Sequence, residues 1–345
     1  MRGAWFAVLV GCGLPAVDVE GQHVRVAADP GLELCGGTLT HMDRFIARVA
    51  EEFGRAPPMG DDRIQFYWLA DDFLARSKCP IGAAGCARDG VIYSQTAPHN
   101  HELVHALAYP WGPLPPFFGE GLATAFEGEG LSPVAAEWVT NAELLKAETI
   151  ARSPFSVTYA SAGGFVRSLV EAHGIAAVLR TITGLPREPS LADIDAAFRR
   201  ELDVTLDESL AEYVSFAGAC PRDQTAPLLE CEAPEIAWDG REIAELRTVA
   251  CAQEDVIGPF FYTWGNTLVL RTIVVPEDGL YELNVIANEP AVVSLLECGG
   301  CGPRVAAHAN RGPAAFELSA GLYALRLHGS EPTIDLGWIL RRVDE

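Results

Sequence analysis

Two histidines and a glutamate in HNHELVHALAYPWGPLPPFFGEGLATAFEG, residues 99–128, have types and spacing that can do metal chemistry. His101 and His105 are four residues apart, so on a helix both imidazoles project from one face. Their separation of about one turn is what two ligands of a tetrahedral ion require. Glu102 lies one step round the helix, beside the ion but outside its coordination. Its carboxylate can accept a proton from a metal-bound water, so the pattern predicts a zinc ion that activates water.

The segment after His105 is expected to supply the third ligand. Fourteen residues separate His105 from Glu120. The glycine and prolines among them must end the first helix and turn the chain: Pro110, Gly112, Pro113, Pro115 and Pro116. A second helix is predicted over residues 117–127, with Glu120 in its first turn and directed back at the ion. Three protein ligands leave a fourth position for water, which is typical of a catalytic zinc site.

HELVHAL followed by LPPFFGEGLATAFEG resembles the gluzincin metallopeptidases, in particular the bacterial peptidase-MA-like group with its HExxH motif, proline-bearing turn and EGxA helix. The resemblance covers roughly residues 24–217. It implies Zn²⁺ held by His101, His105 and Glu120, with Glu102 as general base and proton shuttle. The expected activity is hydrolysis of peptide bonds in peptide or protein substrates.

A later stretch, TYASAGGFVRSLVEAHG, resembles the helix that follows the active site in the same family. There a tyrosine often donates a hydrogen bond to the oxyanion, and Tyr159 is the matching residue; its alternative role is that of a core aromatic. The short strand 91–94 is expected to pair with an extended substrate as an edge strand, as in this family, which would read backbone rather than sequence.

The sequence departs from the family pattern at two positions. The spacing between His105 and Glu120 is shorter than in thermolysin-like enzymes, so the two helices must lie close together. Thr124 stands where those enzymes have a carboxylate that orients a histidine, and a threonine is a weaker acceptor for an imidazole N–H. His99 precedes the first ligand by two residues and faces elsewhere on a helix. We expect a capping or surface role for it rather than ligation.

The elements that must position these residues form an α+β region with a small N-terminal sheet. Residues 38–54 predict an amphipathic helix, and residues 64–70 (IQFYWLA) and 91–94 predict strands. Further helices are expected over residues 133–149, 157–172, 190–201, capped by Ser190 with Asp193, and 207–217. The predicted organisation is a signal and tether at residues 1–20, and then a mostly helical, zincin-like metallopeptidase domain over residues 21–226.

The pattern changes after Pro227, so residues 227–345 are predicted to form an all-β domain. Strand-like runs at roughly ten-residue spacing, such as TLVLRTIVV, LYELNVIA and LYALRLHG, indicate an antiparallel, jelly-roll-like sandwich. The phrases VPEDGLYELNV and ELSAGLYALRLHG resemble the bacterial pre-peptidase C-terminal domain, an accessory module of secreted peptidases.

The N-terminus MRGAWFAVLVGCG resembles a bacterial lipoprotein signal, which implies cleavage before Cys12 and a lipid on that residue. The alternative is a buried first strand. With the lipid, the chain would be an exported, membrane-anchored lipoprotein of the periplasm or the cell surface. No later segment approaches the length of a membrane span. A formal charge of −22, with 25 scattered basic residues, argues against nucleic acid as a partner.

Cysteine usage agrees with export, since removing Cys12 leaves an even set of eight. A boundary near residue 226 places four on each side, so each half can close its own bridges, for instance Cys79 with Cys86. Cys298 and Cys301 form a CxxC that can be a redox pair or half a zinc site, but without a second CxxC we expect structural disulfides.

Two other classes of function compete with an active peptidase. One is a pseudopeptidase, a lipid-anchored binding or scaffolding protein that keeps the fold and the zinc. The other is a structural or adhesive surface lipoprotein in which HELVH is coincidental. An intact Glu102 favours the active enzyme over the first rival, because degenerate peptidases often lose this base. Metal content separates the second rival from both.

Overall fold

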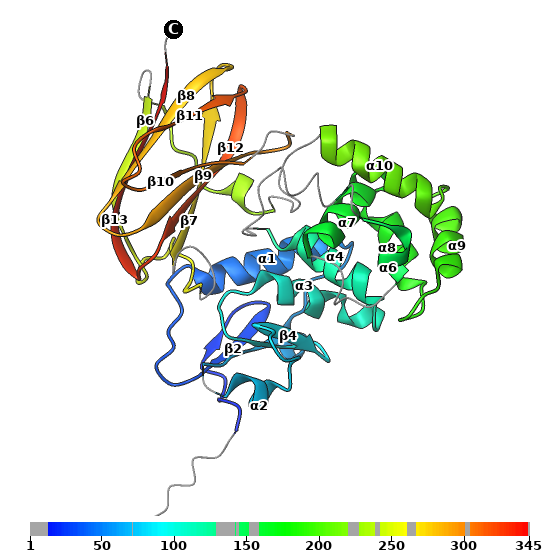
Figure 1. The fold of residues 1–345 in the computed structure, drawn as a ribbon. Helices are drawn as coiled ribbons and strands as arrows, with labels where there is room; N and C mark the ends of the chain where they lie inside the picture. The colour runs from blue at the N-terminus through cyan, green and yellow to red at the C-terminus, as the bar shows by residue number, and fades with distance from the viewer. Residues whose placement is uncertain are drawn as a thin grey trace, which may run out of the picture.

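The computed structural model describes residues 13–70, 72–128, 142, 145–151, 159–219, 228–238, 242–260, 267–300 and 304–343. Cys12, Cys220 and Cys301 therefore lie outside the described residues. The described part has both helices and sheets, as the α+β prediction requires. A small sheet and a group of helices lie on one side, and two further sheets lie on the other (Figure 1).

The N-terminal sheet has five strands in the order β1-β2-β3-β5-β4, with β2, β3 and β5 parallel. Its strands are β1 (Val19–Glu20), β2 (Val24–Ala28), β3 (Ile64–Trp68), β4 (Gly85–Arg88) and β5 (Val91–Ser94). The predicted strands over 64–70 and 91–94 are confirmed as β3 and β5. The expectation that strand 91–94 is a free edge was wrong, because β4 folds back on β5 and takes the edge. A two-residue turn, Asp89 and Gly90, makes this possible, since both have the positive φ of a tight hairpin.

Helices make up most of the chain between residues 38 and 219. They are α1 (Thr38–Glu52), α2 (Phe73–Ser77), α3 (Asn100–Ala108), α4 (Pro116–Phe126), α6 (Ala147–Ala151), α7 (Tyr159–His173), α8 (Ile175–Thr183), α9 (Leu191–Glu201) and α10 (Leu206–Ala219). The predicted helices beginning at 38, 157, 190 and 207 are confirmed within a few residues, and Ser190 with Asp193 forms a capping box. Of the helix expected over 133–149, most lies outside the described residues. Helix α8 was not predicted.

The C-terminal strands form two four-stranded antiparallel sheets, β10-β9-β12-β7 and β11-β8-β13-β6, which confirms the predicted sandwich. The strands are β6 (Glu242–Ala250), β7 (Thr267–Val275), β8 (Gly279–Ala287), β9 (Ala291–Glu297), β10 (Val305–His308), β11 (Ala314–Leu318), β12 (Gly321–Gly329) and β13 (Thr333–Arg342). Strands β6 and β10 were not predicted. In β6, three charged side chains break the apolar pattern on which the prediction depended.

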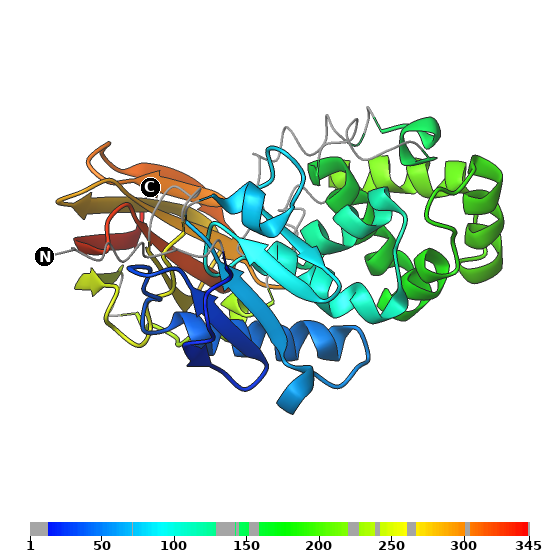
Figure 2. The same ribbon diagram turned by 90° about the horizontal axis from the view of Figure 1, so that it is seen from below.

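The sandwich and the helices are joined at the start of α1. The backbone amides of Gly36 and Gly37 donate to the carbonyls of Cys251 and Val256, at 2.7 and 2.9 Å, in the segment that joins β6 to β7. A Cβ on Gly36 would lie 2.6 Å from a carbonyl oxygen of that segment, so glycine is required for the close approach. Figures 1 and 2 show α1 beginning next to the sandwich and running beside the small sheet.

Three disulfides occur among the described residues: Cys35–Cys251, Cys79–Cys86 and Cys231–Cys298. They are typical of a protein from an oxidising compartment, and the predicted Cys79–Cys86 bridge is confirmed. The expectation that each half closes its own bridges was wrong for Cys35, because the chain before α1 inserts into the β6–β7 segment. Cys298 pairs with Cys231, so it is not the partner of Cys301.

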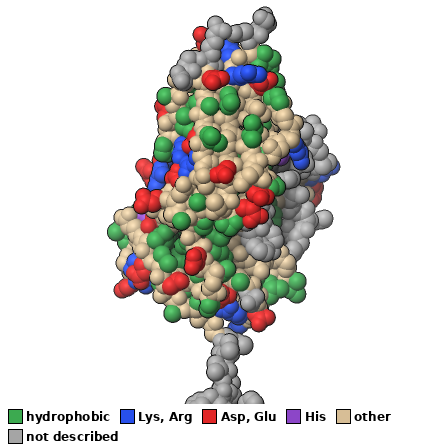
Figure 3. All heavy atoms as spheres, turned by 90° about the vertical axis from the view of Figure 1, so that its left-hand side faces the viewer, with side chains coloured by type: hydrophobic (Ala, Val, Ile, Leu, Met, Phe, Trp, Pro, Cys, Tyr) green, Lys and Arg blue, Asp and Glu red, His purple; other side chains and the backbone are tan. Residues whose placement is uncertain are grey.

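In the view that faces the left-hand side of Figure 1, acidic and basic side chains are interspersed with apolar ones (Figure 3). Among the described residues, no helix is long and apolar enough to cross a membrane.

Candidate metal centre

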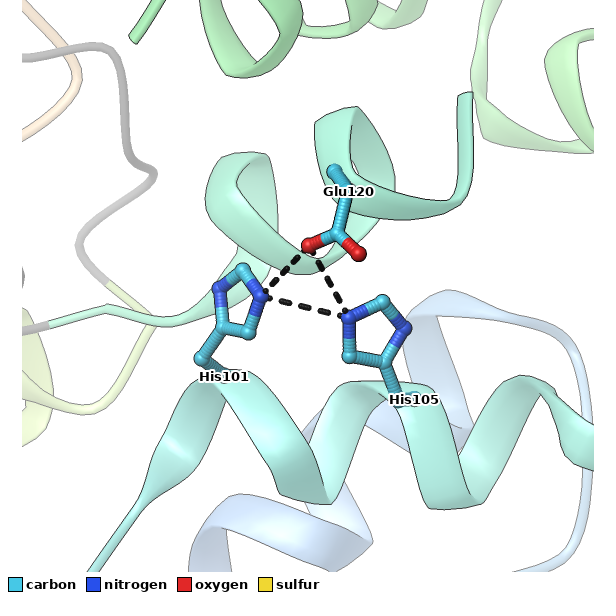
Figure 4. Close-up of side chains that lie close together, drawn as sticks. All are labelled: His101, His105 and Glu120. Carbon is cyan, nitrogen blue, oxygen red and sulfur yellow. Dashed lines mark hydrogen bonds and ion pairs between the residues drawn. The ribbon is translucent and has the colours of Figure 1, made fainter. Parts of the chain in front are cut away.

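His101 and His105 lie on α3 and Glu120 lies on α4, and all three side chains point at one spot between the two helices (Figure 4). The Nε2 atom of His101 is 3.1 Å from Glu120 Oε2 and 3.2 Å from His105 Nε2. His105 Nε2 is 3.3 Å from the same glutamate oxygen. Glu120 is the fifth residue of α4, so it lies in the second turn rather than the first.

This triangle of atoms fits a zinc ion. Ligand atoms of a tetrahedral zinc with bonds of about 2.0 to 2.1 Å are about 3.3 Å apart, and the three observed separations agree with that. Two imidazole nitrogens and one carboxylate oxygen are also a donor set that zinc commonly takes in catalytic sites. Within the described ranges, these side chains form the one group of three or more His, Cys, Asp or Glu residues close enough to share an ion.

A second carboxylate holds the first histidine. His101 Nδ1 donates to Glu127 Oε2 at 2.9 Å, which fixes the ring and leaves the Nε2 lone pair free for a metal. Glu127 was not predicted from the sequence, although its position carries a signal. It follows Glu120 by seven residues, which is two helical turns, so both carboxylates project from the same face of α4.

Thr124 does not take the orienting role considered for it. Its Oγ1 is buried and has no hydrogen-bond partner among the described residues. The helix α7 packs tightly against this side of α4, and a Cβ on Gly163 would lie 2.5 Å from the Thr124 methyl group. A longer carboxylate side chain at position 124 would have to occupy that contact. The orienting carboxylate stands instead at Glu127, at the end of α4.

The electrostatics of the ligands reflect their mutual contacts. Burial lowers the pKa of His101, but the hydrogen bonds that its ring donates to Glu120 and Glu127 outweigh this effect and raise the pKa to about 10. Burial raises the pKa of Glu120, and the hydrogen bonds from His101 and His105 more than reverse this, so its pKa lies well below the usual range. A bound cation would replace the proton that these groups share.

Glu102 is buried beside the three ligand residues without hydrogen-bonding to them. Burial raises its pKa, and the positive charge of His105 and His101 opposes that rise. Its carboxylate accepts a hydrogen bond from the backbone N–H of Ala87 in the edge strand β4. The strand therefore fixes the position of this carboxylate.

His99 has neither of the roles expected for it. It occupies the N-cap position of α3, but its side chain caps nothing. Instead its ring is partly buried, and its Nδ1 is 2.8 Å from Ser94 Oγ on β5. Burial and the nearby His101 lower the pKa of His99 to about 3. Gly85 of β4 lies so close that a Cβ there would be 2.5 Å from His99 Nδ1, so the ring fills the space between α3 and the sheet.

Tyr159 is brought to the same place by α7, of which it is the first residue. Its ring meets the His101 ring edge to face, with the centroids 5.5 Å apart. The side chain is 60% exposed, so Tyr159 is not a core aromatic. Partial burial raises its pKa, as does the negative charge of Glu120, Glu102 and Glu127, so the phenol stays protonated and able to donate a hydrogen bond at neutral pH.

Comparisons with known proteins identify no family for the chain. No family model matches it. No curated protein matches it either. Among solved structures, the pre-peptidase C-terminal domain of a Bacillus anthracis collagenase is similar at a TM-score of 0.23 and 12% identity, covering 32% of this chain and 94% of that one. A periplasmic inhibitor of g-type lysozyme from Aeromonas hydrophila has a TM-score of 0.22 and 8% identity, covering 32% and 96%. Scores this low carry no argument about function.

Proposed function

We propose that the chain is a zinc-dependent hydrolase of peptide bonds. The observation that carries this proposal is the convergence of His101, His105 and Glu120, whose ligand atoms lie 3.1 to 3.3 Å apart, beside a buried Glu102 that is not part of the triangle. The resemblance of HELVHAL and the EGxA helix to gluzincin metallopeptidases supports the same reaction class.

Each side chain has a distinct role in the proposed reaction. Zinc, when bound by the three ligand residues, would lower the pKa of a water molecule to about 7 and polarise a carbonyl. Glu102 accepts the proton that the attacking water loses and passes it to the leaving amine. Burial favours this task, because a raised pKa makes the carboxylate a better base. Tyr159 would donate to the oxyanion of the tetrahedral intermediate, and its contact with the His101 ring supports this role.

The edge strand β4 is the element we expect to hold an extended peptide, in place of strand 91–94. β4 pairs with β5 on one side only, and Ala87 directs its N–H away from β5 to Glu102. The outer edge of β4 therefore runs beside the base and the three ligand residues. A peptide added there would be held by its backbone next to Glu102.

The proposed setting is outside the cytoplasm, with the chain anchored through a lipid on Cys12. The three disulfides support an oxidising compartment. Cys12 itself lies outside the described residues.

The test combines metal analysis with peptide hydrolysis by the full chain. We expect about one zinc per chain. Glu102→Gln should keep the zinc and lower the turnover of a mixed peptide library about 100- to 10,000-fold, because an amide cannot accept the proton. His101→Ala is the control that loses zinc and activity together.

Three results would count against the proposal. A chain that binds no zinc, or a Glu102→Gln variant as active as wild type, would refute the mechanism. Wild type that holds zinc and cleaves nothing would support the alternative, a catalytically inactive binding protein on the same fold.

A further inference from the structure

An open, shallow surface pocket of about 550 Å³ lies at one end of β4, lined by Asp89, Tyr109, Pro110, Gly112 and Pro113. Asp89 comes from the tight turn between β4 and β5, and the other residues follow the end of α3. The turn rests on the aromatic ring, since a Cβ on Gly90 would lie 3.3 Å from Tyr109 Cδ1. The pocket therefore lies between the turn that follows the edge strand β4 and the segment that follows α3, the helix with both histidines.

The pocket continues the surface of the candidate metal centre. β4 runs alongside α3: Gly85 approaches His99, Ala87 donates to Glu102, and the turn at Gly90 meets Tyr109. Tyr109 follows His105 by four residues in a chain that is still helical there, so it lies on the same side of the helix, one turn further on. A peptide lying along β4 thus reaches this pocket within a few residues of the ligands.

The carboxylate of Asp89 gives the pocket a negative charge that can pair with a ligand. Asp89 is exposed, and no hydrogen bond or ion pair of its carboxylate occurs within the described part of the chain. The guanidinium of its neighbour Arg88 donates to the carbonyls of Ser77 and Lys78 instead. Arg55 stacks over the ring of Trp111 at 5.3 Å. Neither arginine neutralises Asp89.

The other wall of the pocket also suits a cation. Tyr109 is 49% exposed, so its ring is accessible from the pocket. An aromatic face within about 6 Å of a positive group attracts it, and a nearby carboxylate adds an ion pair. The formal charge of −22 on the whole chain favours the approach of cationic peptides over long distances.

We propose that this pocket is a subsite for a positively charged group of the peptide substrate. Antiparallel strand pairs outnumber parallel ones in proteins, and β4 runs from the His99 end of α3 toward Tyr109. An antiparallel peptide would therefore place residues on the N-terminal side of its cleaved bond at the pocket. The positive group is either a lysine or arginine side chain at that position or the free amino terminus. Its part in hydrolysis depends on the proposed function, but the binding itself does not.

Binding is tested with peptides and the Glu102→Gln variant of the full chain, so that cleavage does not interfere. One peptide series carries lysine at each position in turn, and a matched series carries norleucine. Each peptide is prepared with a free and with an acetylated amino terminus, which separates the two sources of charge. We expect one lysine position, or the free terminus, to strengthen binding roughly three- to tenfold, the range of a partly exposed ion pair with an aromatic contact.

Asp89→Asn in the same background should abolish this preference and leave the norleucine peptides unaffected. Asn tolerates the positive φ of 52° at this position, so the hairpin should be kept. Asp203→Asn is the matched control, because Asp203 is also an exposed aspartate with positive φ, at 60°, between α9 and α10. It should change nothing.

The outcomes separate the subsite from the enzyme. Equal binding of lysine and norleucine peptides with either terminus, or equal effects of Asp89→Asn and Asp203→Asn, would overturn the subsite even if wild type hydrolyses peptides. If binding depends on charge and on Asp89 but the wild type cleaves no peptide, the subsite is supported and the proposed peptidase activity is refuted.

Discussion

Two clusters of charged side chains, one fully buried and one partly buried, are built in opposite ways, although they lie near each other: a Cβ on Gly128, next to Glu127, would be 3.7 Å from Glu230 Oε1. Where β12 meets the 3-10 turn η4 (Glu230–Glu232), Arg326 donates to Glu230 at 2.7 Å, and their side chains are 1% and 2% exposed. Glu230 also accepts the N–H of Leu229. At the candidate metal centre, by contrast, two Nε2 atoms and one carboxylate oxygen converge on a single point.

The two clusters differ in whether the protein itself supplies the opposite charge that each one needs. In the Arg326 cluster, a positive group meets a negative one, so the protein itself compensates the cost of burial. In the cluster of His101, His105 and Glu120, lone-pair donors face one another, and a shared proton or a cation is needed to hold them together. We infer that the first cluster serves the packing of the sandwich and the second serves a ligand.

The largest expected effect concerns the cluster that is complete on its own. Arg326→Met leaves Glu230 buried without its partner, so we expect the free energy of unfolding to fall by about 3 to 5 kcal/mol. The measurement is unfolding in urea of the full chain. Zinc bound per folded chain should stay the same, because no ligand residue is touched.

A double variant sharpens this test. Replacing both partners, as Arg326→Met with Glu230→Leu, removes the unpaired charge and should recover most of the lost stability. If Arg326→Met alone is as stable as wild type, the ion pair is not a packing element, and the contrast between the two clusters fails.

The next effect concerns the support of the metal cluster. Glu127→Gln replaces the acceptor of the His101 Nδ1–H with an amide, which is a weaker acceptor, so we expect zinc affinity to fall about 10- to 100-fold. Competition with a chelator of known affinity measures this. Thr124→Val is the control, because Thr124 Oγ1 has no partner within the described residues and the change keeps the side-chain shape. If Thr124→Val lost more zinc affinity than Glu127→Gln, Glu127 would not be the residue that orients His101.

The parts of the site that follow from local periodicity were predicted from the sequence. His101 and His105 share a helix face because of their spacing, and the prolines before Glu120 bring the second helix back over the first. The spacing of Glu127 from Glu120 indicates only a shared helix face, and Glu127 was missed because its contact with His101 also depends on how α3 and α4 cross. The same holds for the edge strand, since a tight turn at Asp89 and Gly90 moves β5 into the interior of the sheet.

Long-range pairing limited the prediction of the fold in a similar way. The alternating strands and the capped helices could each be predicted from their local sequence. The Cys35–Cys251 bridge, whose two cysteines are 216 positions apart in the sequence, depends on the insertion of the segment before α1 into the β6–β7 segment. Gly36 and Gly37 are the residues that make this insertion possible, but two adjacent glycines also occur in ordinary turns. Their role is visible only with the carbonyls that they contact.

The smallest expected effect separates a contact at the metal cluster from a role in the reaction. Tyr159 touches the His101 ring but makes none of the contacts within the triangle, so Tyr159→Phe should leave zinc affinity and stability unchanged. If its hydroxyl donates to the oxyanion, kcat should fall about tenfold with KM nearly constant, since the interaction exists only in the transition state. A tenfold fall in kcat is small for the removal of an oxyanion donor, because water can replace the hydroxyl of a residue that is 60% exposed. Steady-state kinetics on one good peptide substrate give kcat and KM separately. A variant with unchanged kcat would make Tyr159 a packing residue for His101, and a variant that loses zinc would place it in the support of the metal cluster beside Glu127.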